Sequence, residues 1–226
     1  MSPLLRAHRL HKRFILHNHG TEIPVLAGTS LTVEAGECIA LQGPSGSGKS
    51  TFMRSLYGNY RVDSGSVWVR HEDKWVDIPQ LPPHELIAVR RRSLGYVSQF
   101  LRVIPRVPAL DVAAEPLVAW GAPLEEARER VACLFAQLNL PRRLWMLSPT
   151  TFSGGEKQRV NIARALAVPY PVLLLDEPTS ALDDANREVV IRLMEARRAQ
   201  GSALVGIFHD QAVRDRVCNR TLTFEG

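Results

Sequence analysis

One stretch decides the fold of this chain: Gly43-Pro44-Ser45-Gly46-Ser47-Gly48-Lys49-Ser50-Thr51. It fits the pattern G-x-x-x-x-G-K-[ST], whose glycines let a loop turn tightly and point successive backbone N–H groups at phosphate oxygens. In that pattern the lysine, here Lys49, reaches the β- and γ-phosphates of a nucleotide, and the hydroxyl of Ser50 ligates Mg²⁺. The alternative is a glycine turn that only caps a helix, and the neighbouring sequence decides between the two.

The residues on either side of this loop predict a strand before it and a helix after it. The apolar run Cys38-Ile39-Ala40-Leu41 leads into the loop, and a helical pattern runs from Lys49 to about Tyr57. A strand, a glycine-rich loop and a helix in this order form the setting that the phosphate-binding pattern needs. The positive end of the helix adds to the attraction for phosphate. We therefore expect the loop to bind a nucleotide.

A second signal is an acidic pair that ends an apolar run. Val172-Leu173-Leu174-Leu175 is typical of a central parallel strand buried on both faces, and Asp176 and Glu177 follow it directly. Because unpaired carboxylates are costly to bury, the pair must emerge at the carboxyl end of the strand, where open α/β sheets bind ligands. Asp176 is then placed to hold Mg²⁺, and Glu177 to polarise the water that attacks the γ-phosphate. Taken alone, the pair also fits an ordinary helix cap.

A third segment, Ser153-Gly154-Gly155-Glu156-Lys157-Gln158, permits two interpretations. As a capping box, Ser153 caps a helix and Glu156 reaches back to the backbone N–H of the cap. As a phosphate site, the same helix start presents bare amides and a hydroxyl to an anion. We expect both to hold, because a cap that lies open to solvent can also receive a phosphate.

The composition fits an ordinary folded protein. The chain has 226 residues, of which 45% are hydrophobic and 23% charged, with a formal net charge of +5. This length and composition suit one sizeable α/β domain. The positive charge permits attraction to nucleic acid, but no long block of like charges occurs, and Arg90-Arg91-Arg92 is typical of a solvated helix end. We therefore expect no nucleic-acid partner.

The cysteines and the apolar runs indicate in which cellular compartment the chain is expected. The three cysteines, Cys38, Cys133 and Cys218, lie far apart in the sequence and fit free thiols in a reducing, cytoplasmic compartment. No apolar run has the length of a signal peptide or of a membrane span. We therefore expect no direct insertion into a membrane, so any action on a membrane would go through a partner.

Along the chain we expect a single domain over residues 1–226 with a helical subdomain at about residues 100–160. Three prolines predict an irregular region at about residues 70–95. Apolar residues at helical spacing predict helical structure over about residues 109–140, and a polar helix is expected over about residues 184–198.

Taken together, the order and spacing of these motifs resemble those of ABC-family ATPases, from about residue 5 to residue 225. Phe14 falls where an aromatic residue stacks on adenine, and Gln99 resembles the Q-loop glutamine that senses Mg²⁺ and a partner. Ser180-Ala181-Leu182-Asp183 resembles the D-loop, and His209 resembles the switch histidine.

This resemblance implies an α/β fold, a P-loop ATPase domain with a mixed core sheet, an N-terminal antiparallel β subdomain and a helical subdomain. It implies ATP and Mg²⁺ as cofactors, and a head-to-tail dimer in which the signature motif Ser153–Gln158 binds the γ-phosphate held by the opposite subunit. The residues expected in catalysis are Lys49, Glu177 and His209, and those expected to hold the metal are Ser50, Gln99 and Asp176. The residues expected to bind the nucleotide are Phe14, Gly43, Pro44, Ser45, Gly46, Ser47, Gly48, Lys49, Ser50, Thr51, Gln99, Ser153, Gly154, Gly155, Glu156 and Asp183.

A finer resemblance is to the L subunits (PhnL) of the bacterial carbon–phosphorus lyase system. It is carried by Val97–Arg106, Phe14–His17, Ser55–Tyr60, Lys74–Asp77 and Gly206–Asp210. It implies a subunit of a soluble enzyme complex that degrades phosphonates, associated with ribose 1-methylphosphonate 5-triphosphate synthesis. The implied dimer partner is a second ABC ATPase, either the K subunit of that system or a second copy of this chain.

Two other functions remain open at this point. One is the nucleotide-binding subunit of a membrane transporter, of the lipoprotein- or peptide-exporter type, with the permease on another chain. The other is direct catalysis of nucleotide–phosphonate transfer, for which the sequence offers no second catalytic constellation outside the ATP site.

Overall fold

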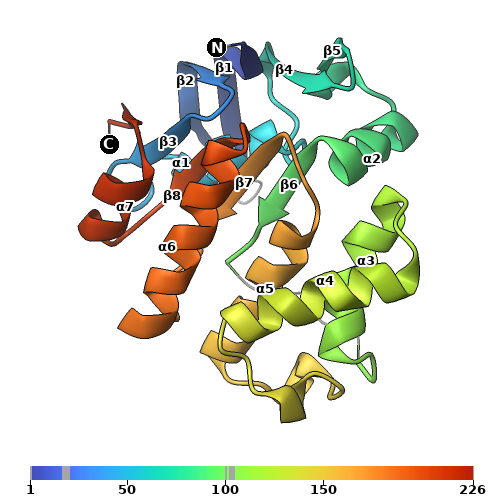
Figure 1. Cartoon of the computed structure of the whole chain (residues 1–226). Helices are drawn as coiled ribbons and strands as arrows, with labels where there is room; N and C mark the ends of the chain where they lie inside the picture. The colour runs from blue at the N-terminus through green and yellow to red at the C-terminus, as the bar shows by residue number, and fades with distance from the viewer. Residues whose placement is uncertain (1, 17–20, 100, 102–104, 226) are drawn as a thin grey trace.

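The computed structural model describes residues 2–16, 21–99, 101 and 105–225 of the chain. Figure 1 shows an antiparallel sheet at the N-terminal side, a second sheet beneath it, and a group of helices beyond the second sheet. Part of the Val97–Arg106 segment and His17 lie outside the described residues.

The N-terminal sheet has the strand order β2-β1-β4-β5, and each neighbouring pair is antiparallel. Its longest pair is the hairpin of β1 and β2, whose register shifts at several points. Such shifts bend and twist a ribbon, which lets one sheet curve over another. The strands are β1 (Pro3–Leu16), β2 (Thr21–Glu34), β4 (Ser64–His71) and β5 (Lys74–Asp77).

The core sheet has the strand order β6-β7-β8-β3-β9. Its strands are β3 (Cys38–Gln42), β6 (Leu94–Val97), β7 (Val172–Asp176), β8 (Ala203–Ile207) and β9 (Arg220–Thr223). The expectation of a mixed core sheet is wrong, because every ladder described in it is parallel. The physical reason is that helical segments connect these strands and return the chain to the same edge of the sheet each time.

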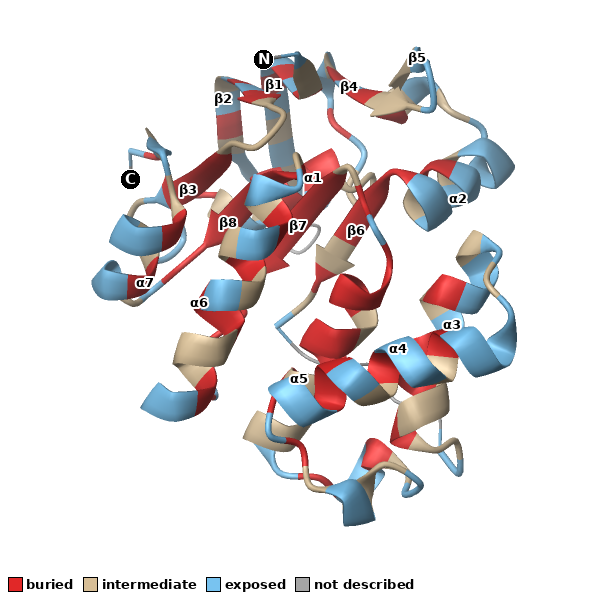
Figure 2. Ribbon diagram, in the orientation of Figure 1, coloured by how far each residue is buried: buried red, intermediate tan, exposed pale blue. Residues whose placement is uncertain are grey.

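The core strands are buried on both faces, as the uninterrupted apolar run predicted. All residues of β7 and of β8 are buried. Alternate residues of β7 serve different cores: Leu173 and Leu175 pack among the helices, and Val172 and Leu174 pack under the antiparallel sheet. Figure 2 shows this central layer in red, while the outer faces of the surrounding helices are pale blue.

The helices are α1 (Lys49–Leu56), α2 (Pro83–Arg92), α3 (Ala109–Trp120), α4 (Leu124–Gln137), α5 (Gly154–Ala167), α6 (Asp184–Ala199) and α7 (Gln211–Val217), with short 3₁₀ turns at Ile78–Gln80, Arg142–Leu144 and Pro149–Thr151. In the described part of the chain no helix is both long and apolar enough to cross a membrane. Helices α3, α4 and α5 pack against one another and lie together below the core sheet in Figure 1.

The expectation of an irregular region over residues 70–95 is wrong. That stretch contains β5, a 3₁₀ turn and helix α2. Pro83 is the first residue of α2, where a proline removes no hydrogen bond and its fixed φ favours the helix. The helical expectations for residues 109–140 and 184–198 are confirmed, with a break between α3 and α4 at Gly121–Pro123. The assignment of residues 1–226 to one domain stays a prediction.

Candidate active site

The glycine-rich loop joins the carboxyl end of β3 to the start of α1, as predicted. Two of its glycines are required by close packing. A Cβ atom on Gly43 would lie 2.5 Å from the carbonyl oxygen of Phe224, and one on Gly48 would lie 2.7 Å from the carbonyl oxygen of Val25. Gly48 also has a φ of 94°, a left-handed conformation that glycine adopts without strain. The loop can therefore keep its shape only with glycine at these positions.

Polar groups inside the loop suit phosphate. The Lys49 ammonium donates to the carbonyl oxygens of Gly43 and Pro44, at 2.8 and 2.6 Å, so its charge lies within the turn of the loop. The Ser47 hydroxyl oxygen is buried and has no hydrogen-bond partner among the described residues. The first turn of α1 adds N–H groups that have no acceptor within the helix. A cation, a buried hydroxyl and these amides match the oxygens of a phosphate group.

The loop opens into a hollow of about 420 Å³ that brings the separate sequence signals together. Glu177 follows β7 and His209 follows β8, and both line the hollow opposite the loop. Its full lining is Val25, Gly43, Ser45, Gly46, Gly48, Lys49, Ser50, Thr51, Glu177, Ile207 and His209. The hollow therefore lies at the carboxyl ends of parallel strands, where the acidic pair was expected to emerge.

The Glu177 carboxylate is held from two sides. One oxygen lies 2.7 Å from Nε2 of His209, and the other accepts a hydrogen bond of 3.1 Å from the Gln99 side chain. The Glu177 backbone has a φ of 53°, which is uncommon for a residue with a Cβ atom. Its carbonyl oxygen accepts from the hydroxyl of Ser180 and from the amide of Gln158, at 3.1 and 3.3 Å. These contacts fix the direction in which the carboxylate points.

Asp176 is buried, 4% exposed, and accepts a hydrogen bond of 2.7 Å from the hydroxyl of Tyr96. Burial raises the pKa of this carboxyl, and the hydrogen bond from Tyr96 opposes that rise because it favours the carboxylate. Tyr96 in turn has a raised pKa because it is buried and lies beside Asp176, so it stays a hydrogen-bond donor. An oriented carboxylate and the Ser50 hydroxyl offer the hard oxygen ligands that Mg²⁺ prefers.

The signature segment, Ser153–Gln158, has no residue among the described residues that line the hollow of the phosphate loop. Ser153 caps α5 in a complete capping box: its hydroxyl accepts from the N–H of Glu156, and the Glu156 carboxylate accepts from the N–H of Ser153 at 2.8 Å. These hydrogen bonds hold the pKa of Glu156 below its usual value. Gly154 lines a hollow of about 460 Å³ that shares no described lining residue with the hollow of the phosphate loop. The capping interpretation is thus confirmed, and phosphate binding at this helix start stays a prediction.

The segment expected to be a D-loop packs directly against the signature segment. A Cβ atom on Gly155 would lie 2.9 Å from the carbonyl oxygen of Ala181, so only glycine fits there. Asp183 caps α6 by accepting from the backbone N–H of Asn186 at 2.8 Å, and it also accepts from the Asn186 side-chain amide. Both segments therefore have structural partners within the chain.

Phe14 is not among the described residues that line the hollow. Its half-buried ring lies edge-on to Tyr60, with ring centroids 5.6 Å apart, and Lys12 lies 5.4 Å from its centroid. Stacking of Phe14 on adenine stays a prediction. Val25, on β2, lines the hollow instead, and no motif in the sequence marks it.

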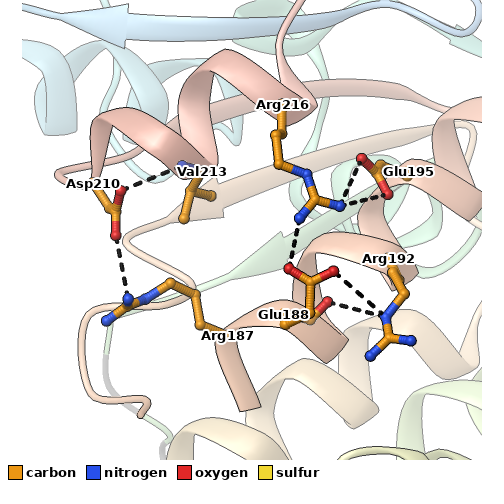
Figure 3. A network of polar contacts seen from close by, with 7 residues as sticks. All are labelled: Arg187, Glu188, Arg192, Glu195, Asp210, Val213 and Arg216. Carbon is orange, nitrogen blue, oxygen red and sulfur yellow. Dashed lines mark hydrogen bonds and ion pairs between the residues drawn. The ribbon is translucent and has the colours of Figure 1, made fainter. Parts of the chain in front are cut away.

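The segment after His209 is anchored to the neighbouring helices (Figure 3). Asp210 caps α7 through the N–H groups of Ala212 and Val213, and its carboxylate lies 3.4 Å from Arg187 on α6. A second ion pair joins Arg216 of α7 to Glu188 of α6 at 2.5 Å. Exposed ion pairs contribute little stability singly, but together they fix α7 against α6 and so fix the backbone beside His209.

Sequence reasoning missed the roles of three side chains that hold site residues or the backbone next to them. They are Tyr96, which donates to Asp176, Gln158, which donates to the carbonyl of Glu177, and Asn161, which donates to the carbonyl of Ser98 at 2.6 Å. Gln158 and Asn161 lie on the buried side of α5, so their polarity at apolar-face positions was the available signal. Tyr96 lies on β6, two residues before Ser98, which directly follows the strand. In the sequence it resembles an ordinary core aromatic residue.

The loop, the acidic strand end and the parallel sheet define a P-loop nucleotide-binding domain. A family model described as ABC transporter matches residues 26–180, which is more than half of the chain. Among relatives, the lipoprotein-releasing system ATP-binding protein LolD of Maricaulis maris is 40% identical over 204 residues, which are 90% of this chain and 86% of that protein. The chain therefore belongs to the ABC family of ATPases, a family defined by ATP binding and hydrolysis.

Other similar proteins agree with this assignment. The macrolide export ATP-binding/permease protein MacB of Hyphomonas neptunium is 39% identical over 87% of this chain, but the match spans only 30% of that longer protein. The dimeric structure of MJ0796, a bacterial ABC transporter cassette, has a TM-score of 0.89 and 29% identity, and covers 98% of this chain and 94% of its own. These relatives are named for lipoprotein release, macrolide export and transport, not for phosphonate breakdown.

Proposed function

We propose that this chain is the ATP-hydrolysing subunit of a larger assembly and works as a head-to-tail dimer of two copies. The observation that carries the proposal is the hollow at the carboxyl ends of the core strands. It brings the cation of Lys49 and the glycine-rich loop to the same space as Glu177 and His209. Strong phosphate binding and a positioned base in one space are the two requirements of phosphoryl transfer to water.

One group of residues fits the phosphates of ATP, and another group fits the Mg²⁺ ion. The loop residues 43–51 surround the phosphates, with Lys49 at the β- and γ-phosphates. Ser50, Asp176 and Gln99 would hold Mg²⁺ through oxygen atoms. When bound, this ion supplies charge neutralisation at the phosphate oxygens. Two observations support this fit: the buried Ser47 hydroxyl has no partner among the described residues and can serve a phosphate, and the hydrogen bond from Tyr96 orients an Asp176 oxygen that a cation can use.

Glu177 is the base in this proposal. Its carboxylate accepts a proton from a water molecule as the water oxygen attacks the γ-phosphorus and the bond to the β-phosphate oxygen breaks, which yields ADP and phosphate. His209 and Gln99 bind the two carboxylate oxygens in the present structure, at 2.7 and 3.1 Å. They are therefore positioned to orient Glu177 and, after small side-chain rotations, to contact the γ-phosphate and the water.

The dimer follows from the separate position of the signature segment. Ser153 caps a helix whose first amides suit a phosphate, yet the hollow that Gly154 of this helix lines is distinct from that of the phosphate loop in the same chain. In a head-to-tail dimer, this helix start faces the γ-phosphate held by the other copy. The dimeric MJ0796 structures support this arrangement, and one of them is described as a post-hydrolysis state bound to ADP and phosphate.

For the assembly that the dimer drives, the relatives favour a membrane exporter. LolD of Maricaulis maris aligns over most of both chains, and its name places it in a lipoprotein-releasing system. In this candidate function, the chain is the cytoplasmic ATPase subunit, and closing and opening of its dimer change the conformation of a permease on another chain.

The second candidate is the carbon–phosphorus lyase system, with a soluble enzyme core as the partner. It is supported by where the resembling segments lie. Tyr57, Asn59 and Tyr60 of the Ser55–Tyr60 segment line one surface hollow of about 630 Å³ together with Ser98 and Gln99 of the Val97–Arg106 segment. Residues that resemble one subunit type thus meet on one surface beside the ATP site, where Gln99 would sense a partner.

One capture experiment separates the two candidates. The Glu177→Gln protein, loaded with ATP and Mg²⁺, is used to capture partners from a host lysate and from solubilised membranes, with the Lys49→Ala protein as the matched control. Recovery of a polytopic membrane protein, dependent on ATP, supports the exporter. Recovery of soluble carbon–phosphorus lyase subunits instead supports the phosphonate system and excludes the exporter.

A further inference from the structure

Two cysteines that the ATP site does not use lie in contact. The Sγ atoms of Cys38 and Cys218 are 3.4 Å apart, although 180 positions separate the residues in the sequence. Cys38 is buried at the start of β3, and Cys218 is half-buried between α7 and β9. The third cysteine, Cys133, lies alone and exposed on α4. The first two therefore form the one close thiol pair within the described residues.

The backbone around this pair is fixed by hydrogen bonds. The N–H of Cys38 donates to the side-chain oxygen of Asn219 at 2.9 Å, and the N–H of Asn219 donates to the carbonyl of Cys38 at 2.8 Å. The N–H of Cys218 donates to the carbonyl of Arg214 at 2.9 Å. From the next residues onward, β3 and β9 pair in parallel, beginning with Ile39 and Arg220. Cys38 and Cys218 thus lie one and two residues before the first pair of this ladder, on backbone that these hydrogen bonds fix.

We propose that Cys38 and Cys218 form a reversible disulfide when the chain meets hydrogen peroxide. The half-buried Cys218 thiol is oxidised first: its sulfur takes one oxygen from the peroxide to give a sulfenic acid, and one water is released. The Cys38 sulfur then attacks the Cys218 sulfur, the S–O bond breaks, and the oxygen leaves as a second water. Two thiols and one peroxide therefore give one disulfide and two waters, and a dithiol reductant reverses the reaction.

The charges beside the pair fit this order of events. Arg198 donates to the carbonyl of Val217 at 2.5 Å and lies 3.5 Å from the Asn219 side-chain oxygen, so its guanidinium lies on the backbone segment that carries Cys218. The contact with Cys218 and burial raise the pKa of Cys38, which suits the thiol that attacks second rather than the one that reacts with peroxide. An S–S bond of about 2.05 Å requires the two sulfurs to approach by little more than one ångström.

The consequence is a covalent link between β9 at the sheet edge and β3, the strand that carries the phosphate loop at its other end. β9 is a short edge strand of four residues, and most of its residues are exposed. The cross-link joins residues 180 positions apart, and a cross-link that closes so long a loop strongly restricts the unfolded chain. Oxidation would therefore hold the C-terminal segment on the core sheet, at the end of β3 away from the ATP site.

The test uses the full chain with Cys133→Ser, so that the exposed thiol plays no part. After treatment with hydrogen peroxide, the intact mass should fall by about 2 Da, and dithiothreitol should restore it. A peptide that links Cys38 to Cys218 should appear after non-reducing digestion. The midpoint of thermal unfolding should rise by about 5 °C in the oxidised form.

The matched control carries Cys133→Ser and Cys218→Ser, and should neither lose hydrogens nor change its unfolding midpoint on oxidation. Cys218 is half-buried, so this control leaves the buried Cys38 and its packing in place. A mass gain of about 16 or 32 Da without a cross-link would overturn the proposal, because it would mean that the thiols oxidise separately. A disulfide that joins two molecules instead of one would overturn it as well.

Discussion

The phosphate loop and the signature segment are both helix starts built from glycine and serine, yet they differ in what surrounds them. Around Lys49, separate strands bring a carboxylate and a histidine to the same hollow. Around Ser153, the helix is capped by its own Glu156, and the hollow beside this helix start, which Gly154 and Lys157 line, has no carboxylate or histidine among its described lining residues. In the proposed function, the first region carries out the chemistry, and the second supplies one phosphate contact to it.

This difference implies that the chain contains two unlike halves of a working site. Under the proposed function, binding of nucleotide depends on the loop within one chain, whereas hydrolysis depends on a second copy that presents its signature segment. Variants of the two regions should therefore fail in different ways.

Changing Glu177 to Gln should slow hydrolysis by about 10²–10⁴-fold, because the amide cannot accept the proton of the attacking water. ATP binding should stay within about threefold of the original, since the loop residues are untouched. Phosphate release in single-turnover assays measures the first effect, and equilibrium titration with labelled ATP measures the second. An equal loss of ATP binding would mean that Glu177 maintains the local structure or holds the metal ion, and that it does not act as the base.

Changing Lys49 to Ala should weaken ATP binding by about 100-fold, since a charge-assisted contact to two phosphates is lost. The loop carbonyls that accept from Lys49 belong to Gly43, which is half-buried, and Pro44, which is exposed, so both can be hydrated and the fold should persist. Calorimetric titration with ATP and Mg²⁺ measures the affinity, and circular dichroism controls for folding. Undiminished affinity in a folded variant would exclude the loop as the phosphate site.

The signature segment is tested by a pair of variants that both preserve the helix cap. Ser153→Asp and Ser153→Asn are good N-caps, so both should unfold at temperatures close to the original. Only the aspartate brings a negative charge to the proposed phosphate contact, and it should lower hydrolysis by about 10-fold to 100-fold relative to the asparagine. ATP binding by the separate chain should change by less than about threefold in both. Equal turnover by the two variants would remove the signature segment from the site.

The smallest effect is expected at Tyr96. Changing Tyr96 to Phe removes the hydroxyl that donates to Asp176 and keeps the ring, so the Mg²⁺ concentration for half-maximal activity should rise about fivefold. The maximal rate at saturating Mg²⁺ should change little. Tyr57→Phe is the matched control, because its ring packs against Tyr96 with centroids 5.0 Å apart and has no described contact with Asp176. An unchanged Mg²⁺ dependence would make Tyr96 a packing residue only.

Much of the phosphate-loop region was predictable because its chemistry is local. Nine consecutive residues specify the loop, and a charged pair after an apolar run has only the strand end available to it. The meeting of Glu177 with His209 and Gln99 was inferred from resemblance rather than from spacing. It depends on three strand ends being neighbours in one sheet, which local sequence does not encode.

The two predictions that were wrong, and the one contact that was not foreseen, also have physical causes. Helix α2 was missed because its prolines look like breakers, although Pro83 stands at the one helical position that favours it. The core sheet was expected to be mixed, but the direction of each strand is set by its connections and not by its residues. The Cys38–Cys218 contact joins residues 180 positions apart, and no spacing rule indicates such a pair.

The central claim, that two copies share the ATP site, is tested most directly by the mass of the Glu177→Gln protein in solution. Light scattering after size exclusion should give the monomer mass of 25.2 kDa without nucleotide and about twice that value with ATP and Mg²⁺. Adding Ser153→Asp to the same protein should return it to the monomer. A protein that binds ATP with unchanged affinity and remains at 25.2 kDa at every concentration would contradict the account.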